Sequence, residues 1–453
     1  MSLSSLSRRH LIQLMGSVAL LPLVSLPAVA QPAAAARLIV LSDLHSAYER
    51  SAQLLAAVAA EIASNPAPTA ILINGDVFEM GNVVASRSAG AIDWLLLEKL
   101  SRLAPTILNI GNHEPDLIND LAQMIAKARA AGVTVLSNIT DSRTGSLYTQ
   151  PGFQLDLGSI PVAVVGIATA AINTYPKASR EQLTIPDPVA WAKASLNEYL
   201  PAGSVPVVLS HAGVVADRSI LPLLPDGSLL VGGHDHLVLS HQEGKTRYVH
   251  TGSWSSRYTV IDIAADRTML VSQVGVEIDA PADEDLAALI ASSMNEHLTA
   301  EERAIVGTSA EPMNLGQSAR FAATAMAAAV GADVGFIGHT TFGTGLPEGE
   351  VSKYVFDSVV RFDGKLVMAV VDRTTLGALI ARANQDGDTP LSARTGDFLY
   401  AAPIELEDKP LYTIVANDWS ATNQKTYFGR EDLVFAETDP VLPVKGTVLA
   451  ALN

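Results

Sequence analysis

Short groups of Asp, Asn and His residues follow five apolar runs along this chain. Each run has the length of a β-strand and is rich in Ile, Val and Leu. In chain order the groups are Asp43-Leu44-His45, Gly75-Asp76, Gly111-Asn112-His113-Glu114, Ser210-His211 and Gly233-His234-Asp235-His236. Ligands of open α/β sheets bind beyond the carboxyl ends of the strands. We therefore expect the five groups to meet at one edge of one sheet.

The side-chain types suit two divalent metal ions. Imidazole together with carboxylate favours Zn, Mn, Fe or Co over Ca, without selecting among them. Two ions about 3.5–4 Å apart can share a carboxylate, and Asp76 is the natural bridge between the two sets. We expect one ion to be bound by Asp43, His45, Asp76 and His236, and the other by Asp76, Asn112, His211 and His234.

The placement of the histidines supports this interpretation more than any single motif does. An isolated Asp-x-His or Gly-Asp pair occurs by chance in most chains of this length. Five of the ten histidines, however, follow these strands: His45, His113, His211, His234 and His236. The alternative, that unrelated histidines lie in loops, does not account for this order.

Alternating strands and helices are expected to position these groups. Strand-like runs cover Leu38–Leu41, Ala70–Ile73, Thr106–Ile110, Val133–Leu136, Pro161–Ile167, Val205–Leu209 and Leu229–Val231, followed by hairpin-like strands at Arg247–His250 and Tyr258–Ile263. Helical patterns cover Ser51–Ala63, Ala91–Leu103 and Leu117–Ala131. This alternation is typical of an α/β layered fold.

The length of 453 residues suits two domains after an export signal. A Pro- and Asp-rich stretch at 280–285 indicates a boundary, and residues 281–300 are expected to form a linker helix. A second domain then covers 301–453. It has a helix at Ser318–Val330, a Gly-rich stretch at Gly338–Gly349, and strands at Lys365–Val371 and Tyr412–Ala416.

The N-terminus has the pattern of an export signal. Arg8 and Arg9 precede an apolar run from about residue 14 to 30, which ends in Ala28-Val29-Ala30. Paired arginines are typical of twin-arginine signals, so we expect residues 1–30 to direct the protein to the periplasm or outside the cell. The alternative is a retained membrane anchor, which Pro22 and Pro27 disfavour. No stable membrane span is expected after cleavage.

Composition excludes several function classes. The formal net charge of -17 would repel a nucleic acid polymer, although bound metals can still receive a small anion. The absence of cysteine excludes disulfides, thiolate zinc sites and cysteine nucleophiles.

The mature chain resembles the calcineurin-like metallophosphoesterases, and among them the exported two-domain 5'-nucleotidases. The five groups above carry the resemblance, with Ser210-His211 extended to Ala212-Gly213. The resemblance implies a four-layer α/β/β/α metallophosphoesterase sandwich over residues 36–280. A smaller α+β C-terminal domain, similar to the substrate-binding domain of 5'-nucleotidases, would follow.

This resemblance implies a mechanism. Two metals activate water for attack on phosphorus and stabilise the developing charge. His113 donates a hydrogen bond or a proton to the leaving oxygen, and Asp116 keeps His113 protonated. Asp116 also suits the N-terminal turn of a helix. Glu114 is expected to be structural.

In the second domain the resemblance is looser. Relatives hold the phosphate with arginines and stack the base between two aromatic rings, but no arginine lies between Arg320 and Arg361. His339 is a candidate replacement donor. Candidate stacking residues are Phe356, Trp419 and Tyr427, although aromatic residues are equally common in a core.

Three functions are therefore considered. The first is hydrolysis of a nucleotide, as a 5'-nucleotidase or a 2',3'-cyclic nucleotide phosphodiesterase. The second is hydrolysis of a non-nucleotide ester, such as another organophosphate or a carrier-bound sulfur group. The third is a binding protein without catalysis, which the complete set of candidate ligands disfavours.

Overall fold

The computed structural model describes residues 34–403, 405 and 407–452, and residues 34–453 form one compact unit. The predicted signal at residues 1–30 lies outside the described residues. Among the described residues, no helix is both long enough and apolar enough to cross a membrane.

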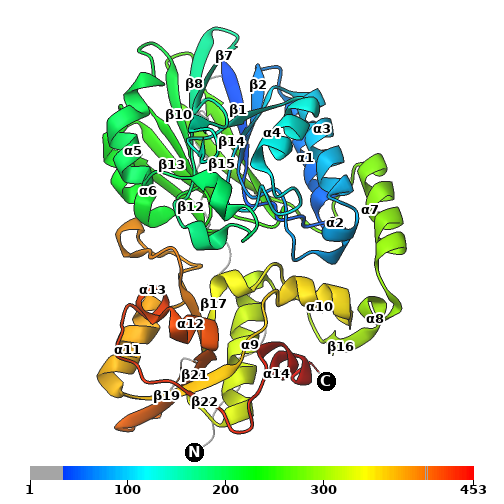
Figure 1. Ribbon diagram of the computed structural model, residues 1–453, viewed down its shortest axis with the longest axis vertical. Helices are drawn as coiled ribbons and strands as arrows, with labels where there is room; N and C mark the ends of the chain where they lie inside the picture. Colours follow the sequence, from blue (N-terminus) through cyan, green and yellow to red (C-terminus); the bar gives the residue numbers. More distant parts are fainter. Residues whose placement is uncertain (1–33, 404, 406, 453) are drawn as a thin grey trace, which may run out of the picture. The chain divides into compact units, whose positions relative to one another are not determined.

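Two six-stranded sheets form the N-terminal part of this unit (Figure 1). The first has the order β15 (Met269–Gly275), β14 (Arg257–Ile263), β1 (Ala36–Leu41), β2 (Thr69–Asn74), β3 (Thr106–Asn109) and β4 (Val133–Leu136). The second has the order β12 (Val238–Glu243), β13 (Thr246–Thr251), β11 (Leu229–Gly232), β10 (Val205–Ser210), β8 (Ile160–Ile167) and β7 (Gly152–Leu157). Strands β1 to β4 are parallel, as are β8, β10, β11 and β13.

The alternation of side chains along the strands creates a four-layer sandwich. In β1, Leu38 and Val40 join the apolar core between the two sheets, whereas Ile39 and Leu41 face the helices. Helices α1 (Ser51–Ser64), α3 (Ala91–Leu103), α4 (Leu121–Ala130) and α7 (Glu284–His297) cover the first sheet. Helices α5 (Pro188–Ser195) and α6 (Val214–Ile220) cover the second (Figure 1). The predicted fold class is confirmed.

The expectation of a single sheet edge was wrong. The candidate ligands follow β1, β2 and β3 in one sheet and β10 and β11 in the other. Strands β13 and β14, expected to be hairpin-like, belong to different sheets, where β13 forms a hairpin with β12 and β14 forms one with β15. Apolar patterns identify buried strands but do not specify which strands pair. Helix α4 begins at Leu121, four residues later than predicted, because the Asp120 side chain accepts the Ala122 N–H and caps it.

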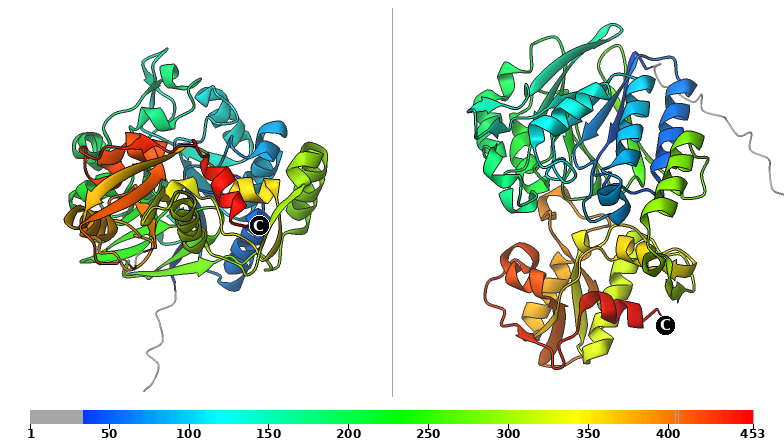
Figure 2. Two further views of the ribbon diagram at one scale, coloured as in Figure 1. Left: turned by 90° about the horizontal axis from the view of Figure 1, so that it is seen from below. Right: turned by 45° about the vertical axis from the view of Figure 1, so that its right-hand side comes forward.

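The C-terminal domain has a five-stranded sheet with the order β20 (Leu399–Ala402), β17 (Val334–Gly338), β21 (Leu411–Asn417), β19 (Leu366–Asp372) and β22 (Ala436–Glu437). Helix α9 (Leu315–Val330) packs across β17, β20 and β21 (Figure 2). Strands β16 (Ile305–Ser309) and β18 (Gly349–Ser352) form a separate ribbon. Helices α10 (Lys353–Val359), α11 (Arg373–Arg382), α12 (Asp418–Thr422), α13 (Gln424–Phe428) and α14 (Val444–Ala450) complete this domain.

Candidate metal centre

The candidate ligands occupy unusual backbone conformations directly after the strands. Five non-glycine ligands have positive φ angles: Asp43 (51°), His45 (49°), Asp76 (55°), His234 (74°) and His236 (55°). Residues with a Cβ rarely adopt this left-handed region, and they remain there only when surrounding contacts hold them. Such clusters are typical of functional sites.

One group of side chains converges around His45 and His236. Their Nε2 atoms lie 2.9 Å apart. Asp43 Oδ1 lies 3.8 Å from Nε2 of His236, and Asp76 Oδ2 lies 3.8 Å from Nε2 of His45. These four residues are the set expected to bind the first ion.

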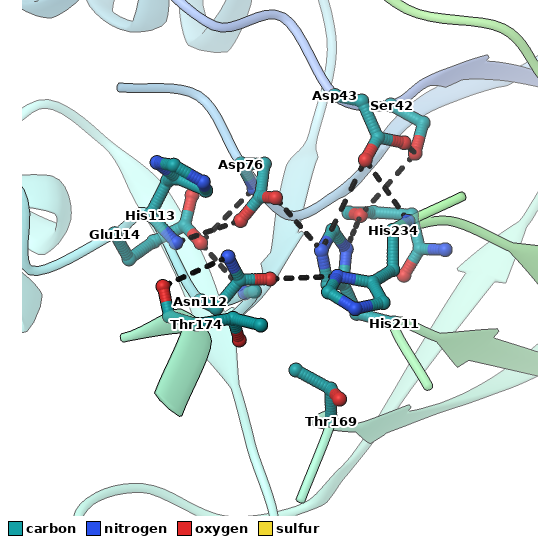
Figure 3. A network of polar contacts seen from close by, with 12 residues as sticks. Ser42, Asp43, Asp76, Asn112, His113, Glu114, Thr169, Thr174, His211 and His234 are labelled. Carbon is teal, nitrogen blue, oxygen red and sulfur yellow. Dashed lines mark hydrogen bonds and ion pairs between the residues drawn. The ribbon is translucent and has the colours of Figure 1, made fainter. Parts of the chain in front are cut away.

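A second group of side chains also converges on Asp76 (Figure 3). Its Oδ2 atom lies 3.0 Å from Nε2 of His211, and Nδ1 of His234 lies 2.8 Å from Oδ1 of Asn112. The Asn112 amide donates to the Thr174 carbonyl at 3.4 Å, which leaves Oδ1 of Asn112 facing His234. Asp76 is therefore common to both groups, as a bridging carboxylate must be.

The pKa shifts of the candidate ligands favour the binding of cations at this site. Burial lowers the pKa of His234 to about 3 and also lowers the pKa of His45 and His236, so these rings are neutral and present lone pairs. Burial would lower the pKa of His211 as well, but Asp76 and Asp43 outweigh it and raise that pKa to about 10. The two buried carboxylates thus demand positive charge at this point, which divalent ions would supply.

Backbone contacts fix the orientation of His211. Its Nδ1 lies 2.7 Å from the Asn74 carbonyl, so Nδ1–H donates there and Nε2 is directed at Asp76. Gly75, with a φ of 77°, permits this approach. A Cβ at Gly75 would lie 2.7 Å from both Nδ1 of His211 and the Gly111 nitrogen.

Glu114 holds the loops that carry the ligands. Its carboxylate accepts from the backbone N–H groups of Asp76 at 3.0 Å, Val77 at 2.9 Å and Gly111 at 2.6 Å. The side chain is fully buried. This geometry agrees with the structural role expected from the sequence.

We predict that Glu114→Ala destabilises the protein. Each buried, unpaired N–H costs about 1–3 kcal/mol, so three of them should lower the free energy of unfolding by about 3 kcal/mol or more. Urea unfolding in the presence of a chelator would measure this loss independently of metal binding. Glu114→Gln keeps one acceptor oxygen and should lose less. Equal stability of the Ala variant and the unaltered protein would contradict the structural role.

His113 and Asp116 form a pair at the edge of the second group. Nδ1 of His113 lies 2.9 Å from Oδ2 of Asp116, which also accepts from the Met80 N–H at 2.8 Å. Burial would lower the pKa of His113, but Asp116, Asp76 and Glu79 outweigh it and raise that pKa to about 10. The His113 side chain is 22% exposed, whereas the His211 side chain is 0% exposed. His113 is thus the protonated group that a substrate can reach.

Two contacts of His45 were missed by the sequence analysis. Glu79 Oε2 lies 3.3 Å from Nδ1 of His45, and the indole of Trp254 stacks on the His45 ring at 4.7 Å. Glu79 follows Asp76 by three residues and Trp254 follows β13. A search for acidic and aromatic residues just beyond the strand ends would have found both.

The structure does not bring the expected substrate-binding residues together at the metal centre. Phe356 is 3% exposed and belongs to a hydrophobic core cluster, and Tyr427 is 6% exposed in another. Trp419 is exposed, and its indole N–H donates to the Tyr427 hydroxyl at 3.3 Å. Both nitrogens of His339 bond to backbone groups, as described below.

Residues 36–238 match the family of calcineurin-like phosphoesterases, so the N-terminal part of this chain is a metallophosphoesterase domain. No curated protein sequence matches the chain.

Solved structures with a similar fold cover both domains. The chain is similar to a 5'-nucleotidase precursor from Thermus thermophilus, at 18% identity and a TM-score of 0.58 over 92% of this chain and 96% of that one. A sulfate thiohydrolase from Thermus thermophilus matches at 14% identity and a TM-score of 0.62, over 93% and 94% of the two chains. A 5'-nucleotidase from Candida albicans matches at 10% identity and a TM-score of 0.58, over 93% and 98%.

Proposed function

We propose that this protein hydrolyses small phosphate monoesters, nucleotides among them, at a two-metal centre. The observation that carries the proposal is the pair of ligand groups sharing Asp76, with the His113–Asp116 pair beside them. Asp43, His45, Asp76 and His236 would hold one divalent ion, and Asp76, Asn112, His211 and His234 would hold the other.

The metal ions and the protein side chains would perform different parts of the reaction. When bound, the ions polarise the phosphoryl group and make water a nucleophile at neutral pH. Asp116 accepts the Nδ1–H of His113 and keeps the ring protonated. Nε2–H is then the proton that His113 can give to the leaving oxygen. Positioned proton transfer of this kind contributes about 10²–10⁴-fold to the rate.

The lysines and arginines of the C-terminal domain are already paired, which limits how they can bind an anionic substrate. Between residues 304 and 452 every lysine and arginine has a partner. Arg320, Lys353, Arg361, Lys365, Arg373, Lys409, Lys425, Arg430 and Lys445 pair with carboxylates, while Arg382 and Arg394 donate to backbone carbonyls. The negative charge of the substrate would therefore rest mainly on the two ions.

Because the lysines and arginines of this domain are already paired, a second candidate function is also favoured. It is hydrolysis of a carrier-bound sulfur group at the same centre. The likeness to a sulfate thiohydrolase supports the fold for this reaction. The two candidates differ in the group that is cleaved, and they share the ligands.

We predict that phosphate release from AMP or UMP requires Mn or Zn and stops on chelation. A substrate panel that also contains an aryl phosphate and a thiosulfonate ester would separate the candidates. Activity on nucleotides supports the first, and activity on the thiosulfonate alone selects the second. Protein that contains two metal ions per chain and cleaves none of these esters would contradict catalysis.

We also propose that the protein is exported, because Arg8 and Arg9 precede an apolar run. Cell fractionation should recover the chain from the periplasm or the medium. Replacing both arginines by lysine should retain it in the cytoplasm. Unchanged export of that variant would argue against the twin-arginine route.

A further inference from the structure

His339, in the C-terminal domain, contacts the loop that carries His234 and His236. Its Nε2 lies 3.0 Å from the carbonyl oxygen of Asp235, the residue between these two ligands. Because a carbonyl can only accept, Nε2–H donates to Asp235, and Nδ1, 3.3 Å from the Phe398 nitrogen and 3.2 Å from its carbonyl oxygen, then accepts from the Phe398 N–H. The ring also stacks on Phe398 at 4.2 Å and is 5% exposed. His339 is therefore held firmly and bonds directly to the ligand loop.

The loop needs such support because its backbone is strained. The residues on both sides of Asp235 have positive φ, as described above. The Asp235 carboxylate accepts from the Val214 N–H at the start of α6, which fixes the loop from within the metallophosphoesterase domain. The His339 bond fixes it from the C-terminal domain.

A second residue of the C-terminal domain, Arg361, contacts His45 indirectly, through two other side chains. Arg361 forms an ion pair with Glu79, and its guanidinium lies over the Trp254 ring at 4.3 Å. Glu79 and Trp254 both contact the His45 ring, which also lies against the rings of His113 and His236.

These two contacts differ in the ions that they reach. The loop held by His339 carries one ligand of each ion, His234 and His236, whereas Glu79 and Trp254 contact His45, a ligand of the first ion alone. The remaining ligands of the second ion are oriented from within the metallophosphoesterase domain, through the Asn74 carbonyl on His211 and the Thr174 carbonyl on Asn112. The support given by the C-terminal domain is thus unequal between the two positions.

We propose that Arg361 is a positioning residue for one ion only, the ion held by Asp43, His45, Asp76 and His236, and that His339 positions one ligand of each ion through the Asp235 carbonyl. The inference rests on the two-metal site of the proposed function. The C-terminal domain completes the outer shell of the first ion, so its occupancy depends on contact between the domains. Outer-shell partners of metal ligands typically contribute about 10–100-fold to metal affinity.

Two variants test this, His339→Ala and Arg361→Met, each loaded with Mn and then dialysed against a graded series of chelator concentrations. In Arg361→Met, metal analysis should show that one ion leaves at about 10–100-fold lower chelator strength while the other is unaffected, and the EPR spectrum of two coupled Mn ions should give way to that of one isolated ion. In His339→Ala, both ions should leave at lower chelator strength. His339→Gln can still donate to the Asp235 carbonyl and should restore most of the affinity.

Arg320→Met is the matched control, because Arg320 also combines an ion pair, with Asp386, and a ring contact, with Tyr400. It should keep both ions. Circular dichroism of the metal-free variants establishes that they fold. Equal weakening of both ions in Arg361→Met, or unchanged affinity in folded His339→Ala and Arg361→Met, would overturn the inference. Two ions with no esterase activity in the unaltered protein would instead contradict the proposed function alone.

Discussion

Replacing His113 by Asn is expected to lower turnover of a nucleoside 5'-phosphate by about 10²–10⁴-fold while two metal ions remain bound. The Asn amide is not acidic enough to transfer a proton to the leaving oxygen. The metal ions should remain because His113 lies outside both sets of expected ligands. The loss should depend on the leaving group. An alkoxide must be protonated as the bond breaks, whereas nitrophenolate leaves without help, so p-nitrophenyl phosphate should be affected much less.

Steady-state kinetics on both substrates, with metal analysis of the same preparation, would measure this effect. Asp116→Asn is the companion variant, since an amide cannot hold the imidazolium as a carboxylate does. It should show the same dependence on the leaving group with a smaller loss. Loss of a metal ion from His113→Asn would instead make His113 a ligand.

The second large effect is expected for Asp76→Asn. Asp76 belongs to both ligand groups, and its Oδ1 also accepts from the His113 N–H at 2.8 Å. Removing its charge should weaken both ions together and lower activity by more than about 10³-fold, because metal ions contribute several kcal/mol to stabilising the transition state.

Thermal unfolding separates this loss from misfolding. Metal-free Asp76→Asn serves as the reference for the variant, because loss of the contact between Asp76 and His211 can change stability without any metal. Addition of Mn at about 100 times its dissociation constant should stabilise the unaltered protein by about 2.7 kcal/mol and leave the variant unchanged. A variant that is still stabilised by Mn and still active would show that Asp76 does not bridge.

The convergence of the candidate ligands could be predicted because each lies within four residues after an apolar strand. The backbone of a strand carries its last residue to the sheet edge, so Asp43, Asp76 and His211 can be placed without knowing which strands pair. Pairing itself depends on contacts between distant segments, and for this reason the division between two sheets was not predicted.

The contacts of the second domain could not be predicted in this way. His339, considered as a phosphate donor, bonds to the Asp235 carbonyl 104 positions earlier in the chain. Phe356, considered as a base platform, lies on the buried side of α10. The sequence pattern around a loop histidine or a helical phenylalanine does not predict which distant residues it contacts. These contacts depend on tertiary packing. Arg361 likewise gains its role from Glu79 and Trp254.

A crystal structure of the protein loaded with Mn, recorded with anomalous scattering, tests the central claim most directly. We expect two anomalous peaks about 3.5–4 Å apart on either side of the Asp76 carboxylate, one beside His45 and His236 and the other beside His211 and His234. A single peak, or peaks remote from Asp76 in protein that hydrolyses phosphate esters, would contradict the two-metal account.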